Sequence, residues 1–170
     1  MMNNLYRNQK GFALMETLIA VAVIGTIATT FSGTIFDIFT STERNNAYMS
    51  AACNIENASR LISIDGQMAQ SSSLIPGESA INNINLTWTD PANGNIHEVY
   101  YYQTGDNLQR RELLNSIMQN EKSVAVPITS IFFSQPVSEE RLFTFIITSS
   151  GGSSRVSETK EYHVTCRAIN

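Results

Sequence analysis

An uncharged apolar run near the N-terminus constrains this 170-residue chain more than any other feature. Between Glu16 and Asp37 the sequence reads TLIAVAVIGTIATTFSGTIF and contains no Lys, Arg, Asp or Glu. A helix over residues 12–36 would be about 37 Å long at ~1.5 Å per residue, enough to cross a hydrocarbon core of roughly 30 Å. The run therefore predicts a membrane-spanning helix.

Basic side chains lie directly before this run. Arg7 and Lys10 are the charged residues of the first eleven positions, which hold no acid. The positive-inside rule keeps such an N-terminus in the cytoplasm and places the following part of the chain outside. We therefore expect a single-pass protein of the cytoplasmic (inner) membrane with an extracytoplasmic head.

Two ordinary kinds of N-terminal segment do not account for Glu16. A secretory signal peptide has an apolar core of about 7–15 residues and a small-x-small cleavage site, whereas this run is longer and holds an acid near its start. A plain signal anchor explains the length and the flanking charge but gives no reason for the acid. A carboxylate inside the bilayer costs about 2.5–3.5 kcal/mol on insertion scales, and such groups usually have a partner.

The residues from Lys10 to Gly25, KGFALMETLIAVAVIG, resemble the processing signature of type IV prepilins and type II secretion pseudopilins. The resemblance implies that a prepilin peptidase cleaves between Gly11 and Phe12 on the cytoplasmic side. It also implies that Phe12 becomes an N-methylated first residue and that Glu16 is the fifth residue of the mature chain. Assembly of a filament would then depend on Glu16.

The chemistry of this spacing is consistent with the resemblance. Cleavage would free an α-amine with an unperturbed pKa near 8, which is charged at neutral pH. Glu16 lies one helical turn from that amine and would neutralise it, either within one subunit or, as the resemblance favours, between neighbours. Many members of the family have a proline that kinks this helix. Here Gly33 lies nearby, and glycine also loosens a helix.

The remainder of the chain predicts an α+β head in which the long helix packs on an antiparallel β-sheet, as in type IV pilins. Past Phe39 apolar residues recur at three- and four-residue steps, which indicates an amphipathic continuation of the helix. The stripe comprises Tyr48, Ala51, Ala52, Ile55, Ala58 and Ile62. The resulting division is a leader (1–11), a transmembrane assembly helix (12–36), its soluble half (37–66) and a β-rich head (67–170).

Alternation of apolar and polar residues predicts the strands of the head. Ile84, Leu86 and Trp88 alternate with polar residues, and the Asn93-Gly94 dipeptide favours a hairpin turn. The segment 115–123 is interpreted as a short helix or loop. The other strands are expected at 99–103, 108–114, 130–134, 141–148 and 156–169.

The two cysteines, Cys53 and Cys166, are far apart in the sequence. Cys166 lies on the apolar face of the last strand and Cys53 close to the apolar stripe of the helix. A disulfide between them would join helix to sheet and contribute about 4–5 kcal/mol in the chain-entropy model. The alternative is two free buried thiols.

No constellation of an enzyme, a cofactor or a metal site is evident. His97 and His163 are the two histidines, too few for a three-histidine zinc site. Nucleophile elbows, phosphate loops and C-x-x-C motifs are absent from the sequence. A set of turn residues could bind Ca²⁺ or merely form turns, namely Asp90, Asn93, Asn95, Asp106 and Asn107. We expect no enzymatic activity and no cofactor.

Charge disfavours broad binding to nucleic acid. Residues 1–11 hold two of the 11 basic and none of the 15 acidic side chains, so the rest of the chain carries a net charge of −6. Such a body repels a phosphate backbone. For Arg110 and Arg111 the alternatives are a local basic patch and, as the favoured interpretation, two solvated arginines on a strand.

The leading hypothesis is therefore a minor pilin or pseudopilin, a structural filament subunit of a type II secretion or type IV pilus system. The resemblance implies as partners other pilin subunits, the prepilin peptidase, an inner-membrane assembly platform and the lipid membrane. Weaker cues in the head resemble the J-type pseudopilins and W-type minor pilins. The alternatives are a DNA-uptake (competence) or adhesive minor pilin that binds a ligand through its head loops, and a membrane-tethered enzyme.

Overall fold

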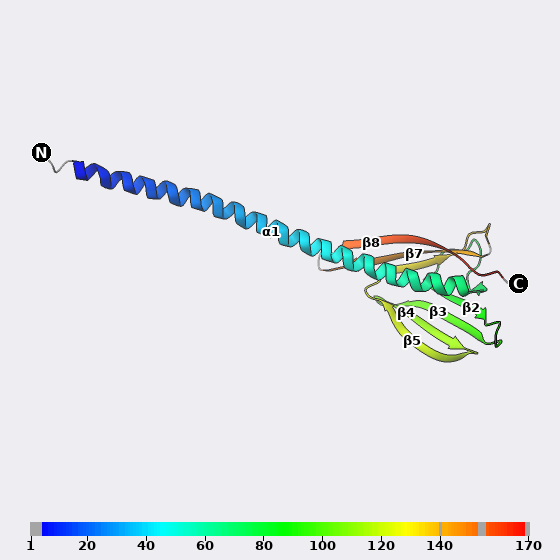
Figure 1. The fold of residues 1–170 in the computed structure, drawn as a ribbon. Coiled ribbons are helices and arrows are strands. Elements are labelled where there is room, and N and C mark those ends of the chain that lie inside the picture. Colours follow the sequence, from blue (N-terminus) through cyan, green and yellow to red (C-terminus); the bar gives the residue numbers. More distant parts are fainter. Residues whose placement is uncertain (1–4, 140, 153–155, 169–170) are drawn as a thin grey trace. The chain divides into compact units, whose positions relative to one another are not determined.

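The computed structural model of the chain describes residues 5–139, 141–152 and 156–168, with side chains from Ala13 onward. The chain forms two units, Met1–Glu43 and Arg44–Asn170. One helix, α1 (Leu5–Met68), runs through both, and all the strands belong to the second unit. Figure 1 shows the order of these elements along the chain.

The first unit consists of the N-terminal part of α1. Every described side chain from Ala13 to Glu43 is exposed. The helix contains an apolar stretch that is long enough to cross a membrane, and none of that stretch is buried within the structure. The predicted helix over residues 12–36 is thus present, and its apolar surface has no cover from the described part of the chain.

Five strands form the larger antiparallel sheet, sheet A, in the order β1-β2-β3-β4-β5. Tight turns connect β2 to β5 as a meander, and the short β1 adds to the outer edge of β2. The bounds are β1 Ser71–Ser72, β2 Asn83–Thr89, β3 Ile96–Thr104, β4 Asn107–Leu114 and β5 Ile117–Ala125.

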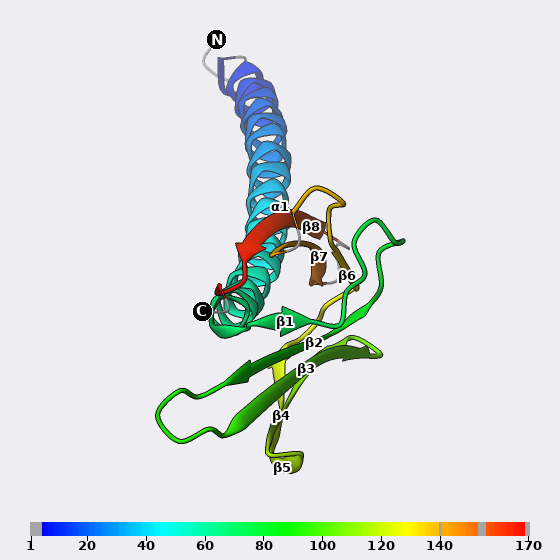
Figure 2. The ribbon, with the colours of Figure 1, turned by 90° about the vertical axis from the view of Figure 1, so that its right-hand side faces the viewer.

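Three strands form a second antiparallel sheet, sheet B, in the order β6-β7-β8. Their bounds are β6 Ser130–Ser134, β7 Leu142–Gly151 and β8 Val156–Thr165. Ile81, just before β2, forms an isolated bridge with Phe133 of β6 and so links the two sheets. In Figure 2 the strands of both sheets can be followed around the C-terminal end of α1.

The core of the second unit lies where the C-terminal part of α1 meets both sheets. In Figure 1 sheet B lies above this part of the helix and sheet A below it. The helix contributes Ile55 and Ile62, both fully buried, between small residues that let the sheets come close. The largest buried side chains of the sheets are Tyr101, Phe133, Phe143 and Phe145.

Two glycines lie where α1 and sheet B come into close contact. A Cβ atom on Gly66 of α1 would lie 2.7 Å from both Phe143 Cζ and Val164 Cγ1. A Cβ atom on Gly151 of β7 would lie 2.1 Å from the carbonyl oxygen of Ala47. Since real Cβ atoms do not come this close to backbone oxygens, β7 can approach α1 at Ala47 in this way only with glycine at position 151.

The α+β architecture predicted from the sequence is confirmed, with differences in detail. The head has two sheets rather than one, and the buried stripe of the helix uses Ala47 in place of Tyr48, which is 45% exposed. The segment 115–123, interpreted as a helix or loop, is a turn followed by β5. The prediction failed because both faces of β5 are exposed from Ile117 to Ser123, so its sequence has no alternation of apolar and polar residues.

Candidate functional site: the N-terminal helix

The candidate functional site is the apolar helix of the first unit, with Glu16 as the charged residue near its start. Glu16 has no hydrogen-bond or ion-pair partner among the residues that the structure describes. From Thr17 to Phe36 the helix surface is uncharged. A carboxylate on such a surface is costly in hydrocarbon and requires a cation from outside the described chain.

The hydroxyl groups of the helix from Thr17 to Thr40 are satisfied by carbonyl groups of the helix itself. Seven of them donate hydrogen bonds to carbonyl oxygens three or four residues earlier, with distances from 2.8 to 3.1 Å. They belong to Thr17, Thr26, Thr29, Thr30, Ser32, Thr34 and Thr40. A polar group inside a bilayer must find its partner within the protein, so these bonds make the segment compatible with lipid.

The apolar side chains of the helix form a continuous exposed surface. Leu14, Ile24, Phe31 and Phe36 are each more than 60% exposed. A shallow notch lies between Thr26, Ile27, Thr30 and Phe31. Soluble domains rarely expose contiguous apolar surface of this extent, so lipid or other helices must cover it.

The predicted processing residues precede this surface. The backbone is helical at Gly11 and Phe12, and the side chains of Arg7, Lys10 and Phe12 lie outside the described residues. Glu16 follows Phe12 by four residues on one continuous helix, which puts the acid one turn from the expected new N-terminus. Cleavage, methylation and the pairing of Glu16 stay predictions.

The cysteines are not bonded to each other. Cys53 is exposed on α1 and accepts a 3.6 Å contact from the side-chain amide of Asn57, whereas Cys166 is buried. Burial raises the pKa of the Cys166 thiol. The candidate disulfide is thus not formed in this structure, because Cys53 lies outside the helix face that packs on the sheets.

A buried charge cluster joins α1 to sheet A. Arg110 on β4 donates to Asp65 on α1 through Nε (2.7 Å) and Nη2 (3.1 Å), and through Nη1 to Glu112 (2.8 Å). The hydroxyl of Tyr101 also donates to Asp65. Burial disfavours the charged guanidinium, yet hydrogen bonds to the two carboxylates raise the pKa of Arg110. Burial and the charge of Asp65 raise the pKa of Tyr101.

This cluster corrects the interpretation of both arginines as solvated. Arg110 is 9% exposed and faces the core, while its neighbour Arg111 faces outward and pairs with Glu121 at 3.1 Å. Successive residues of a strand point to opposite faces, so one arginine had to turn inward. The sequence signal that could have found this was Asp65, an acid on the otherwise apolar side of the amphipathic helix.

The turn residues considered for Ca²⁺ are not brought together. Asp90, Asn93 and Asn95 lie in the β2–β3 turn and Asp106 and Asn107 at the β3–β4 turn, at opposite ends of β3. Asp90 and Asn93 accept hydrogen bonds from backbone N–H groups two residues later, as turn residues do. Within the described parts of the chain, no group of three His, Cys, Asp or Glu could hold a metal ion.

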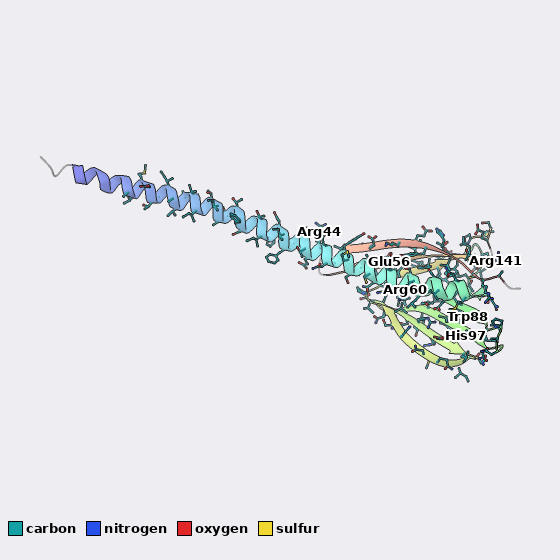
Figure 3. The ribbon with its side chains drawn as sticks, in the orientation of Figure 1. Arg44, Glu56, Arg60, Trp88, His97 and Arg141 are labelled. Atoms are coloured by element: carbon teal, nitrogen blue, oxygen red, sulfur yellow. The ribbon has the colours of Figure 1, made fainter. Side chains whose placement is uncertain are left out.

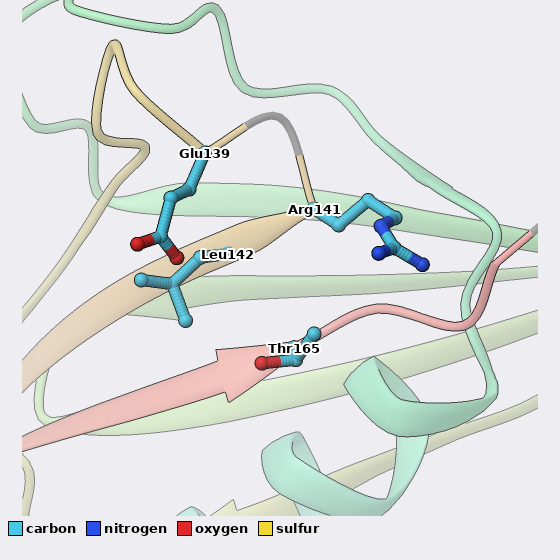
Figure 4. Close-up of a pocket in the computed structure, with 4 residues that line it drawn as sticks. All are labelled: Glu139, Arg141, Leu142 and Thr165. Atoms are coloured by element: carbon cyan, nitrogen blue, oxygen red, sulfur yellow. The ribbon is translucent and has the colours of Figure 1, made fainter.

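A pocket of about 330 Å³ lies at the start of β7, lined by Glu139, Arg141, Leu142 and Thr165. Figure 4 shows the carboxylate of Glu139 and the guanidinium of Arg141 pointing in opposite directions. Because the charged groups do not converge, the pocket lacks the arrangement of a binding or catalytic site.

The comparison with protein families gives one result, and it falls on the candidate site. Residues 6–32 match the model of the prokaryotic N-terminal methylation motif. Comparisons with curated proteins and with solved structures give no significant match. The chain therefore carries the N-terminal signature of type IV pilin-like proteins, on a helix that is long and apolar enough to cross a membrane.

Proposed function

We propose that this chain is a minor pilin or pseudopilin, a structural subunit that assembles into a filament through its N-terminal helix. The observation that carries the proposal is the coincidence of the methylation motif over residues 6–32 with an apolar helix whose acid, Glu16, has no counterion among the residues that the structure describes. The α+β head supports the proposal, because its whole buried core belongs to the second unit and leaves the N-terminal helix free to pack on other subunits.

Processing supplies the missing counterion. A prepilin peptidase would remove residues 1–11, and Phe12 would then carry a charged amine one helical turn from Glu16. Neutralising a carboxylate in the bilayer offsets about 2.5–3.5 kcal/mol of insertion cost. A helix inserted beside its neighbours gains this stabilisation only when the Phe12 amine of one subunit lies at the same height along the filament axis as Glu16 of the next. The pair would therefore set the axial register of the subunits.

The localisation and the partners follow from this assignment. The uncharged helix holds the subunit in the cytoplasmic membrane with the head outside, and the filament forms from subunits that leave the membrane together. The partners are other pilin-type subunits, the peptidase and a membrane assembly platform. Type II secretion and type IV pilus systems both use such subunits. In either system the proposed role of this chain is structural and not catalytic.

The experiment compares two carboxylate changes in cells that express the full chain. Glu16→Gln removes the charge at the start of the apolar run, and Asp37→Asn is the matched control at its other end. Sheared surface filaments and the cytoplasmic membrane are separated and probed for the head. We expect Glu16→Gln to leave the protein processed and in the membrane but to lower its amount in filaments at least tenfold. Asp37→Asn should assemble as the native chain does.

Normal incorporation of the Glu16→Gln variant would refute the role assigned to the carboxylate. Loss of both variants from the filaments would show that any change of charge near the run is disruptive, and would equally contradict the specific pairing.

A further inference from the structure

The β4–β5 hairpin ends in an apolar tip. Leu113 and Leu114 precede the two-residue turn 115–116, and Ile117 and Met118 follow it. Leu113 is paired with Met118 and Leu114 with Ile117, so each face of the hairpin presents two large aliphatic side chains. Ile117 is 67% and Met118 60% exposed. These four residues are here called the hairpin tip.

The fold itself gives no reason for this composition. Ile117 and Met118 are exposed and Leu113 and Leu114 are half-buried, and none of the four belongs to the core cluster. Hairpin turns at a protein surface are usually flanked by polar residues, and contiguous exposed apolar side chains mark interaction sites. The tip therefore has the composition of a binding element.

Hydrogen bonds hold the hairpin tip rigid. The backbone N–H of Asn115 donates to the carbonyl of Ile96 (2.8 Å). The side-chain oxygen of Asn115 accepts a hydrogen bond from the backbone N–H of Ile96 (2.9 Å). Its side-chain amide donates to Asn95 Oδ1 (3.0 Å). The β4–β5 turn is thus fastened to the β2–β3 turn, and a rigid surface loses less conformational entropy when it binds.

The apolar surface continues from the hairpin tip across the end of sheet A. Trp88, His97, Leu114 and Ile117 are successive cross-strand neighbours on the core-facing side of sheet A, where Trp88 also packs against the edge of the core. The rings of Trp88 and His97 stack in parallel with centroids 5.1 Å apart, and Figure 3 shows them together at this end of the sheet. Aromatic side chains beside aliphatic ones are typical of the centres of protein interfaces.

Two carboxylates, Asp90 and Glu98, lie near the hairpin tip, and Arg111, two residues before Leu113, is paired with Glu121. Half-buried Glu98 accepts hydrogen bonds from the hydroxyls of Tyr100 (2.9 Å) and Ser116 (3.3 Å), and Asp90 accepts one from the N–H of Ala92 (2.9 Å). Neither carboxylate forms an ion pair within the described chain. Such a surface attracts Lys and Arg and is repelled by anionic lipid and by a second copy of a body with net charge −6.

We propose that the hairpin tip docks into an apolar pocket on a different protein, and that Lys or Arg side chains rim this pocket. The aliphatic side chains supply the buried area, and Asp90 and Glu98 supply the electrostatic complement. The inference rests on the second unit alone and is independent of the filament role of Glu16.

The experiment uses the full chain in its native membrane with the photocrosslinker p-benzoylphenylalanine at position 117. The matched control carries it at Thr104, which is exposed at the opposite end of β3. We expect position 117 to form an adduct with a different protein, whose crosslinked peptide lies beside Lys or Arg, and position 104 to form at least fivefold less. Asp90→Asn with Glu98→Gln should lower the yield at position 117 at least threefold, because charge complementarity speeds encounter and stabilises the complex.

Four results would overturn the proposal. They are no adduct at position 117, an adduct with lipid or with a second copy of the chain, equal yields at the two positions, and a yield that the loss of both carboxylates leaves unchanged.

Discussion

The buried pair of Asp65 and Arg110 provides the sharpest test of how the helix is attached to sheet A. The side chains of Asp65 and Arg110 are 4% and 10% exposed. Removing one partner of such a pair leaves the other charge buried and costs about 3–5 kcal/mol. Since Glu112 also contacts Arg110 and is 31% exposed, the cost of Asp65→Asn should be near the lower limit, about 3 kcal/mol or roughly a hundredfold in the unfolding equilibrium.

The assay is urea unfolding of residues 44–170, which hold the whole buried core and should fold alone. The midpoint should fall with an unchanged dependence on urea concentration, since the surface exposed on unfolding stays the same. Glu112→Gln is the control, because a partly exposed pair contributes only about 0–1 kcal/mol.

A second variant separates the net contribution of the pair to the free energy of unfolding from the penalty of leaving one buried charge unpaired. Asp65→Leu, Arg110→Met and Tyr101→Phe together replace the cluster with apolar groups and leave no buried charge unpaired. We expect this triple variant to be within about 1 kcal/mol of the native head or more stable, as apolar replacements of buried pairs often are. A loss under about 1 kcal/mol for Asp65→Asn, or an equal loss for Glu112→Gln, would refute the reasoning.

Three further predictions concern the second unit. Gly66→Ala should destabilise the head by about 1–3 kcal/mol, because the added Cβ would overlap two side chains of sheet B. This cost should exceed the gain from the higher helix propensity of alanine. A more stable variant would contradict the packing. Hydrogen bonding to Lys160 lowers the pKa of Glu56 in the folded head. The pair should therefore stabilise the head at pH values above the pKa that Glu56 has in the unfolded chain. This stabilisation should be lost as the pH falls through the lower pKa of the folded state. Glu56→Gln should abolish this loss of stability at low pH. The loss should be under about 1 kcal/mol because both side chains are exposed. A variant whose stability depends on pH as that of the native head does would refute the prediction. A thiol reagent should modify Cys53 at least tenfold faster than Cys166, whose burial raises its pKa, and equal rates would be inconsistent with the structure.

Strong periodic signals made most of the fold predictable from the sequence. The uncharged run dictates a helix because a chain in lipid must satisfy its backbone internally. Alternation at Ile84, Leu86 and Trp88 placed β2, and Ser130–Ser134 was placed at the bounds that β6 has. Cys166 was predicted to lie on the apolar face of the last strand, and it is buried, although β8 ends one residue before it.

The features that the sequence did not reveal depend on contacts between distant residues. Asp65 and Arg110 are 45 positions apart in the sequence. Neither residue shows by itself which partner offsets the cost of burying its charge. The strand β5 was missed because an edge strand exposed on both faces needs no alternation. The candidate site was predictable for the opposite reason, since its recognition depends on a local spacing of residues rather than on the folded head.

The mass of the mature N-terminus tests the central claim most directly. The full chain would be isolated from its native membrane, and its N-terminal peptide analysed by mass spectrometry. The account predicts that the leader MMNNLYRNQKG is absent and that the first residue is Phe12 with one added methyl group. A chain that retains Met1, or one cut beyond Ile35 by an ordinary signal peptidase, would contradict it.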